Sequence, residues 1–154
     1  MDKVTMKVKK LYEDAKLPKK AHIQDGCYDV YCYLPKKEYP AGEVIVQPHE
    51  TVKLHTGFAA SVPEGYFGTI VPRSGLATKE GLRPANTPSV IDVGYTGEWL
   101  VAIHNDSEVI RIIQNGDRIC QMTLIPIPQL EFELVDELED TERGATGFGD
   151  SGKK

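Results

Sequence analysis

One short segment of the chain combines the groups that hold a phosphate. Residues 72–77 read PRSGLA, follow an apolar run, and open the only internal stretch with helical character, about Ser74–Glu80, which Gly81 would end. Arg73, a hydroxyl and the free N–H groups of a helix start would then coincide, and this combination suits an anion. The alternative interpretation is that Ser74 only caps the helix and that Arg73 is only a surface charge.

A second candidate is a carboxylate in an apolar setting. Residues 86–98 read NTPSVIDVGYTGE, a hairpin-like pattern in which Asp92 directly follows two apolar residues. A carboxylate in such a place needs a partner or a chemical task. The alternative is that Asp92 begins a turn and caps it.

Other catalytic patterns are incomplete in the sequence. Residues 147–154 read GFGDSGKK, but the Ser or Thr that a P-loop needs after its Lys is missing. There is no G-x-S-x-G serine motif. The four histidines, His22, His49, His55 and His104, are scattered without the spacing of a helical metal pair. If the protein is an enzyme, water is therefore the better nucleophile.

Composition limits the partners. The chain has 154 residues with 18 basic and 23 acidic side chains, a net charge of −5, so general attraction to nucleic acid polymers or anionic membranes is disfavoured. Any phosphate ligand must be met by a few placed cations. Cys27, Cys32 and Cys120 lack paired spacing and indicate free thiols. No run approaches the roughly 20 apolar residues of a membrane span, and we expect a soluble, cytoplasmic protein.

The elements that must position these residues are strands. Val4, Met6 and Val8 alternate with polar residues, a period of two that is typical of a half-buried strand. Further β-branched and aromatic runs, separated by turn signals, cover residues 28–34, 43–46, 51–62, 66–71, 89–93, 99–104, 109–113, 118–127 and 130–134. Short strands at this spacing predict an all-β, jelly-roll-like sandwich or barrel.

The composition changes towards the C-terminus, where we expect a boundary. Residues 1–134 carry the strand pattern and form the predicted core. Seven acidic residues lie between Glu131 and Glu142, and a glycine-rich stretch covers residues 143–152. Residues 135–154 are therefore predicted to be an acidic connector and a flexible arm. They would form either a solvated tail or a mobile flap over a phosphate, because glycine lets backbone N–H groups crowd an anion.

Together these segments resemble the homotrimeric dUTP pyrophosphatases, or dUTPases, whose five motifs are all present and in order. In this sequence they read GCYDV at 26–30, PRSGLA at 72–77, VIDVGYTGE at 90–98, NGDRICQ at 115–121 and RGATGFG at 143–149. One such motif alone would be weak evidence. Five in the right order are specific.

The resemblance implies a jelly-roll subunit in a homotrimer. One subunit would supply motifs one, two and four to each active site, a second would supply the hairpin of motif three, and the third would lend its C-terminal arm. The reaction would be hydrolysis of dUTP to dUMP and pyrophosphate with Mg²⁺. It would remove dUTP and supply dUMP for thymidylate synthesis.

The resemblance also implies roles in the nucleoside half of the site. Asp92 matches the general base that activates the water attacking the α-phosphorus. Tyr95 matches the ring that leaves no room for a 2′-hydroxyl. Asn86 and Val90 match positions on the segment that binds the nucleoside.

Further matching positions concern the phosphates and the arm. Arg73, Ser74, Gly75 and Gln121 match phosphate contacts, and Asp29 matches a carboxylate that touches magnesium through its water shell, the ion being held mainly by the triphosphate. In the arm, Arg143 would pair with the γ-phosphate, and Phe148 would stack over uracil with Gly147 in the same binding segment.

The sequence departs from the family pattern at four places. Gly26-Cys27 stands in motif one where Ala-Gly is usual, and Gly94 replaces a second Asp after the base. Cys120 replaces a common Ala, and Thr146-Gly147 stands where Gly-Gly is usual.

Two other functions compete with this interpretation. A dCTP deaminase of the same fold would use a glutamate base and a Ser-Ser run, whereas this chain has Asp92 and Ser74-Gly75. A non-catalytic module that binds nucleotide or protein is the other, and the intact Asp92 and Tyr95 argue against it.

Overall fold

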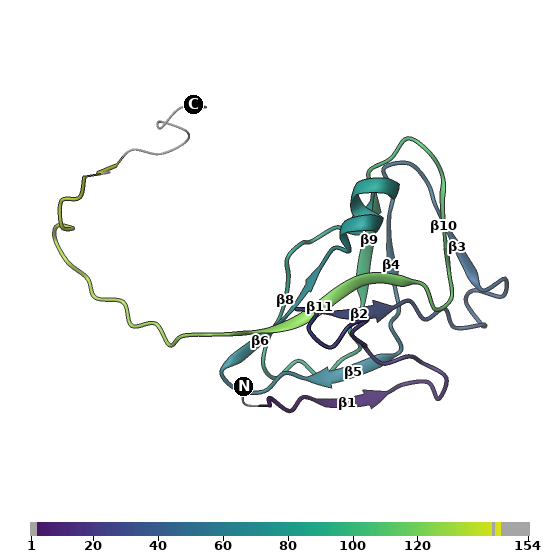
Figure 1. The fold of residues 1–154 in the computed structure, drawn as a ribbon, viewed down its shortest axis with the longest axis horizontal. Helices are drawn as coiled ribbons and strands as arrows, with labels where there is room; N and C mark the ends of the chain where they lie inside the picture. The colour runs from purple at the N-terminus through teal and green to yellow at the C-terminus, as the bar shows by residue number, and fades with distance from the viewer. Residues whose placement is uncertain (1–2, 143, 146–154) are drawn as a thin grey trace.

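Strands make up almost all the regular structure of the residues that the computed structural model describes, which are 3–142, 144 and 145 (Figure 1). In chain order the elements are β1 (Lys7–Lys10), β2 (Tyr28–Tyr31), β3 (Glu43–Val46), β4 (Thr51–Leu54), β5 (Phe58–Ser61), β6 (Tyr66–Val71), the short helix η1 (Leu76–Glu80), β7 (Leu82–Pro84), β8 (Ser89–Ile91), β9 (Val101–Asn105), β10 (Arg111–Gln114) and β11 (Arg118–Pro126). The prediction of an all-β fold is confirmed.

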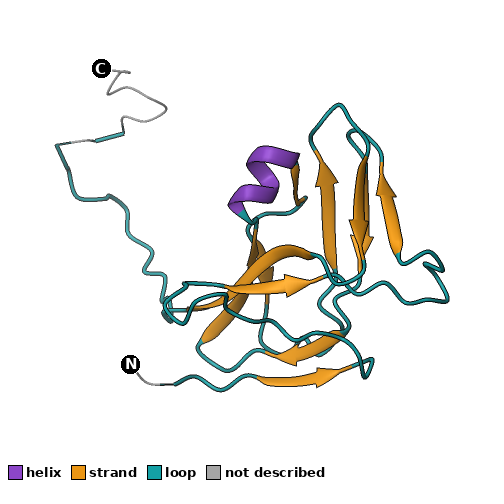
Figure 2. Cartoon of the chain, turned by 45° about the vertical axis from the view of Figure 1, so that its right-hand side comes forward, coloured by secondary structure: helices purple, strands orange, loops and turns teal. Residues whose placement is uncertain are grey.

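Strand β11 lies in the middle of the largest sheet, whose order is β2-β11-β6-β8. It pairs antiparallel with β2 on one side and β6 on the other, so Gln121 stands opposite both Asp29 and Val71. A three-stranded sheet β4-β9-β7 and the ribbons β10-β3 and β1-β5 complete the fold. Figure 2 shows the helix at one side of the strands and the chain after β11 leaving the folded body.

The core forms where the inner faces of these sheets meet. Strand β9 illustrates the pattern, because Val101, Ile103 and Asn105 are buried and alternate with half-buried residues. The largest fully buried side chains include Trp99, Phe58, Leu54, Leu82, Ile103 and Ile119. Alternation thus marks the inward face of β9, whereas Val4 and Val8, which were expected on the buried side of a strand, are exposed.

Some strand boundaries differ from the prediction. The first strand is Lys7–Lys10 rather than the stretch around Val4–Val8. The predicted 51–62 strand is two strands, and the break falls next to Gly57, which has a φ of +75°. A Cβ at Gly57 would lie 2.6 Å from the Cβ of Ala15, so only glycine allows this close crossing. Strand β7 was not predicted, because three residues that include a Pro give no periodic signal.

The predicted strand at 130–134 is wrong. Strand β11 ends at Pro126, and Phe132 and Leu134 are 90% and 100% exposed. A strand needs a hydrogen-bonded partner, and within the described part of the chain this segment has none. No helix in the described residues is long and apolar enough to cross a membrane.

The start of helix η1 differs from the prediction, whereas its end agrees with it. Ser74 does not cap the helix with its side chain, since Gly75 takes the N-cap position without a side-chain hydrogen bond. Instead the Ser74 carbonyl accepts a 2.7 Å hydrogen bond from the Thr78 hydroxyl. Gly81 ends the helix as predicted, with a φ of +72° and its N–H donating to the carbonyl of Leu76.

A buried amide holds two loops on the core. The Asn105 side chain is fully buried, and its Nδ2 lies 3.1 Å from the carbonyl oxygens of Val46 and Gln47 and 2.8 Å from that of Val109. Its Oδ1 accepts the Ser107 N–H at 3.0 Å. One side chain thus satisfies polar groups that folding removes from water.

We predict that Asn105→Leu lowers the free energy of unfolding by about 3 kcal/mol, because buried carbonyls lose their donor. Urea denaturation followed by circular dichroism measures this. Gln24→Leu, at an exposed amide, is the control and should change the free energy by less than about 0.5 kcal/mol. Equal stability of the two variants would contradict the prediction.

Candidate functional site

A buried carboxylate brings three of the predicted phosphate-site residues together. Asp29 lies on β2 with its side chain only 6% exposed. Its Oδ1 is 3.2 Å from Arg73 Nε and accepts from Gln121 Nε2 at 3.2 Å, while its Oδ2 accepts from Arg118 Nη1 at 3.0 Å. The pairing of β11 with both β2 and β6 explains the juxtaposition, because it places these residues on adjoining strands.

The two arginines leave this cluster with an excess of positive charge. Arg73 Nη1 also donates to the carbonyl of Arg118 at 3.0 Å, and both side chains remain partly exposed, at 26% and 46%. Ser74 and Gly75 follow directly and are exposed. Two guanidinium groups around one carboxylate can bind a phosphate through their remaining N–H groups.

Arg118 is a member of this cluster that the sequence did not single out. It belongs to the fourth motif, but its task depends on Asp29, which lies 89 positions away along the chain. The only local signal was the stretch Asn115–Gln121 that contains it.

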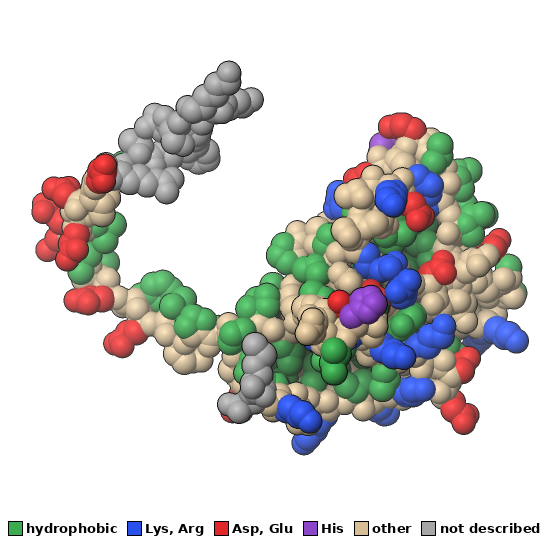
Figure 3. All heavy atoms as spheres, in the orientation of Figure 1, with side chains coloured by type: hydrophobic (Ala, Val, Ile, Leu, Met, Phe, Trp, Pro, Cys, Tyr) green, Lys and Arg blue, Asp and Glu red, His purple; other side chains and the backbone are tan. Residues whose placement is uncertain are grey.

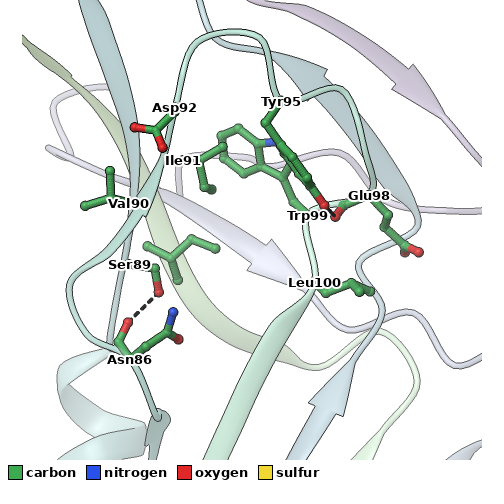
Figure 4. Close-up of a pocket in the computed structure, with 10 residues that line it drawn as sticks. Asn86, Ser89, Val90, Ile91, Asp92, Tyr95, Glu98, Trp99 and Leu100 are labelled. Atoms are coloured by element: carbon green, nitrogen blue, oxygen red, sulfur yellow. Dashed lines mark hydrogen bonds between the residues drawn. The ribbon is translucent and has the colours of Figure 1, made fainter.

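The second predicted group of residues lines a separate pocket (Figure 4). Its lining residues are Ile70, Asn86, Ser89, Val90, Ile91, Asp92, Tyr95, Glu98, Trp99 and Leu100. The Ser89 hydroxyl donates to the Asn86 carbonyl at 2.5 Å and fixes the entry to β8. Asn86, Val90, Asp92 and Tyr95 are thus brought together as predicted.

Asp92 begins a turn, yet its carboxylate does not cap it. The Tyr95 N–H donates to the Asp92 carbonyl at 3.3 Å, and Gly94 within this turn has a φ of +91°. That conformation favours glycine and gives a reason for Gly94 where the family pattern has Asp. In the described part of the chain the exposed Asp92 carboxylate has no hydrogen-bond donor, so a water molecule can approach it.

The expected hairpin is a strand followed by a loop. Strand β8 pairs with β6, and residues 92–98 return without forming a second strand, apart from one bridge between Glu98 and Ala59. The Tyr95 hydroxyl donates to the Glu98 carbonyl at 2.8 Å. A Cβ on Gly97 would lie 2.8 Å from the Tyr95 ring carbon that bears the hydroxyl, so glycine lets the ring lie against the backbone.

Glu98 anchors this loop to the turn between β4 and β5. Its Oε1 accepts from the N–H groups of Thr56 at 3.2 Å and Gly57 at 2.8 Å. Its Oε2 lies 2.8 Å from Nδ1 of His55. Sequence reasoning did not assign this role, because the partners lie about forty residues away in the chain.

Asp92 and Arg73 lie towards opposite ends of β6. Ile91 on β8 stands opposite Gly68 on the antiparallel strand β6. Asp92, the next residue, therefore lies beyond Gly68, towards the start of β6. Arg73 follows the other end of that strand. About six residues of extended chain separate the two positions, which is about 20 Å. One subunit alone therefore does not bring Asp92 next to its own Arg73.

Asp29 is compatible with an ion held by a ligand but not with a protein-built metal cage. No group of three His, Cys, Asp or Glu side chains that could hold a metal occurs among the described residues. The Asp29 carboxylate has roughly four acceptor sites; Gln121 and Arg118 donate to two of them, and the ion pair with Arg73 crowds a third. One remains, which is enough for a water molecule of a phosphate-bound Mg²⁺.

The cysteines near the cluster are not poised for reaction. Burial, with a further contribution from Asp117, raises the pKa of Cys32 to about 12. Burial and the Asp29 carboxylate also raise the pKa of Cys120 far above its ordinary value. Both thiols stay protonated at neutral pH and pack as small apolar side chains.

Three predicted site residues cannot be placed. Arg143, Gly147 and Phe148 lie outside the described residues. Their roles remain predictions.

An arginine-framed anion site and a separate carboxylate pocket on an all-β fold indicate a protein that binds a phosphorylated ligand. The family model described as dUTPase matches residues 13–152. The chain therefore belongs to the dUTPase family, and the predicted family is confirmed.

Individual relatives match over almost the whole chain. The deoxyuridine 5′-triphosphate nucleotidohydrolase of Syntrophotalea carbinolica is 38% identical over 152 residues, 99% of each chain. That of Hydrogenobaculum sp. is 41% identical over 147 residues, 96% of this chain and 97% of the relative.

Solved structures agree with these matches. The dUTPase of Staphylococcus bacteriophage 80alpha with dUpNHpp has a TM-score of 0.82 at 31% identity, covering 96% of this chain and 98% of that one. A variant of the dUTPase from phage phi11 of S. aureus, described with a structural Mg(II) ion, has a TM-score of 0.75 at 27% identity, covering 89% of this chain and 100% of that one.

We predict that Glu98→Ala speeds amide hydrogen exchange at Thr56 and Gly57 by at least about tenfold, because both N–H groups lose their acceptor and the turn opens more easily. Exchange followed by NMR measures this. Glu108→Ala is the matched control, because Glu108 also faces a histidine but is 84% exposed; it should leave these amides unchanged. Unchanged exchange in Glu98→Ala would show that the carboxylate does not hold the turn.

Proposed function

We propose that this protein hydrolyses dUTP to dUMP and pyrophosphate. The observation that carries the proposal is the division of the site into a cationic cluster around Asp29 and a pocket with the exposed Asp92 carboxylate. Membership of the dUTPase family supports dUTP as the substrate, and so does the dUpNHpp bound by the bacteriophage 80alpha relative. The product dUMP would serve thymidylate synthesis.

The working form is a homotrimer with active sites shared between subunits. Support comes from the separation of about 20 Å between Asp92 and Arg73 along β6. A base must come within hydrogen-bond reach of the water that it activates. A complete site therefore takes Asp92 from one subunit and the Asp29 cluster from another, in a closed cyclic assembly.

Asp92 acts as the general base. Its carboxylate takes a proton from a water molecule, whose oxygen forms a bond to the α-phosphorus of dUTP. The bond from that phosphorus to the oxygen bridging to the β-phosphorus breaks, and pyrophosphate leaves. Arg73, Ser74, Gly75 and Gln121 bind the phosphates, and the guanidinium groups offset the charge that builds up on them.

The pocket beside Asp92 binds the nucleoside. Tyr95, fixed by its hydrogen bond to the Glu98 carbonyl, lies against the deoxyribose and excludes a 2′-hydroxyl. Asn86 and Val90 bind the uracil end of the nucleoside. The arm residues Arg143, Gly147 and Phe148 of a third subunit close over the γ-phosphate and the base, which excludes water.

Magnesium bound to the triphosphate would neutralise part of its charge. Asp29 would hold it through a coordinated water molecule, using its remaining acceptor site. The ligands of the protein are predicted to be dUTP, dUMP and pyrophosphate, with no nucleic acid or membrane partner. Its predicted location is cytoplasmic.

We predict that Asp92→Asn lowers kcat by roughly 10²–10⁴ while dUTP still binds, because the amide keeps the shape but accepts no proton. Arg73→Ala should also be nearly inactive. When equal amounts of the two variants are refolded together as mixed trimers, about one quarter of the sites combine an intact Asp92 with an intact Arg73. Activity should then return to about that fraction of wild type. Pyrophosphate release measures both effects.

The double variant Asp92→Asn/Arg73→Ala, refolded with wild type in the same ratio, is the control for mixing. In that mixture the active sites are again about one quarter, so both mixtures should have similar activity if each site spans two subunits. A site built within one subunit would instead give no recovery in the first mixture.

We predict that Tyr95→Ala lowers kcat/KM for dUTP and narrows the difference between dUTP and UTP, because the missing ring leaves space for a 2′-hydroxyl. The measured quantity is the ratio of kcat/KM for the two nucleotides. Tyr95→Phe keeps the ring and loses only the bond to Glu98, so it should preserve most of the discrimination. A parallel fall for both nucleotides in Tyr95→Ala would mean that the ring does not exclude the hydroxyl.

A further inference from the structure

Two lysines stand on the same face of β2 as the Asp29 cluster. Lys19 and Asp29 form an antiparallel bridge, in which each backbone N–H donates to the other residue's carbonyl at 3.1 and 2.9 Å. Directly opposite residues of such a pair project to the same side, with their Cβ atoms about 5 Å apart. Lys19 therefore projects to the face on which Asp29 meets Arg73 and Arg118.

Lys16 reaches the same face from further along the segment. Its ammonium lies 5.3 Å from the centre of the Tyr31 ring, and Tyr31 follows Asp29 by two positions and stands opposite Arg118. The ammonium also lies where a Cβ on Gly116 would be only 2.9 Å away. Lys16 thus borders the turn that leads into Arg118.

Lys20, the next residue after Lys19, lies on the opposite face. Its ammonium is 4.9 Å from the centre of the Tyr28 ring, and Tyr28 lines an apolar groove with Met6 and Val8. Two neighbouring lysines with the same charge therefore face different surroundings.

The charge on the Asp29 face is not balanced by nearby carboxylates. Among the described residues, neither Lys16 nor Lys19 has a carboxylate within 4 Å of its ammonium. Asp14 and Asp117, two other acidic residues, accept hydrogen bonds from uncharged donors, Asp14 from the Tyr33 hydroxyl and Asp117 from the Gln114 N–H. Figure 3 shows Lys and Arg side chains gathered on this side of the molecule, over β2 and the loops beside it.

We propose that Lys16 and Lys19 form an outer cationic rim of the phosphate site, which binds the distal end of the phosphate chain and favours a triphosphate over shorter chains. With Arg73 and Arg118 they place four cations around one carboxylate, in a chain whose net charge is −5. Ammonium groups on long stems act as point charges that can follow a flexible polyphosphate. This inference rests on the proposed hydrolysis of dUTP.

The test compares Lys19→Gln with Lys20→Gln, which remove the same charge from neighbouring positions on opposite faces. We expect Lys19→Gln to raise KM for dUTP about fivefold at low salt, with little change in kcat, because the lost interaction is a partly screened charge contact. Inhibition by dUMP should be unchanged, since a monophosphate does not reach the rim. Lys20→Gln should match wild type in both assays, and Lys19→Arg should restore the KM.

A second measurement separates a charge effect from a structural one. The KM for dUTP should increase less with KCl concentration in Lys16→Gln/Lys19→Gln than in wild type. A folding defect would instead change kcat and the thermal midpoint. Equal KM values and salt profiles for Lys19→Gln and Lys20→Gln would overturn the inference. If wild type itself does not hydrolyse dUTP, the proposed function fails, so the two failures are distinguishable.

Discussion

The burial of Asp29 is the constraint on which the phosphate half of the site depends. A carboxylate with 6% exposure has lost most of its water and must be compensated by donors from the protein. Here the donors come from two segments on neighbouring strands, because Arg73 follows β6 and both Arg118 and Gln121 belong to β11. Satisfying one buried charge therefore fixes the relative positions of β2, β6 and β11 and sets two guanidinium groups side by side.

The same sheet that assembles the cationic cluster keeps the proposed catalytic carboxylate away from it. Arg73 follows the last residue of β6, whereas β8 pairs antiparallel with residues 68–70 and leads into Asp92 towards the start of β6. An extended strand does not shorten, so no side-chain rearrangement closes a gap of about 20 Å. Assembly of subunits is thus a geometric requirement for catalysis as proposed, and the exposed apolar and acidic alternation after β11 is consistent with a segment whose partners lie outside its own subunit.

Local sequence patterns predicted the strands, but they did not show which distant residues make contact. Alternation in β9 and a glycine such as Gly81 are signals carried by neighbouring residues, and both gave correct predictions. The anchoring of Glu98 to His55 depends on how two distant turns meet, and no local pattern records that. The prediction for the 130–134 segment failed for the opposite reason, because its pattern is typical of a strand but it pairs with no strand in the described part of the chain. Arg73, Gln121 and Asp29 were found through motifs, whereas their mutual contacts followed only from the sheet.

The two carboxylates of the proposed site divide the chemistry because their surroundings differ. Asp29 is surrounded by cationic and amide donors, so protein groups already occupy most of the space around its oxygens. Asp92 is exposed and, within the described residues, accepts no hydrogen bond, so a water molecule can approach it without displacing a protein partner. A single carboxylate could not serve both purposes, since the side chains around Asp29 would keep the attacking water away from its oxygens. In the proposed assembly Asp29 lies on β2 and Asp92 follows β8, and the two meet only between subunits, so each keeps the environment that its proposed role requires.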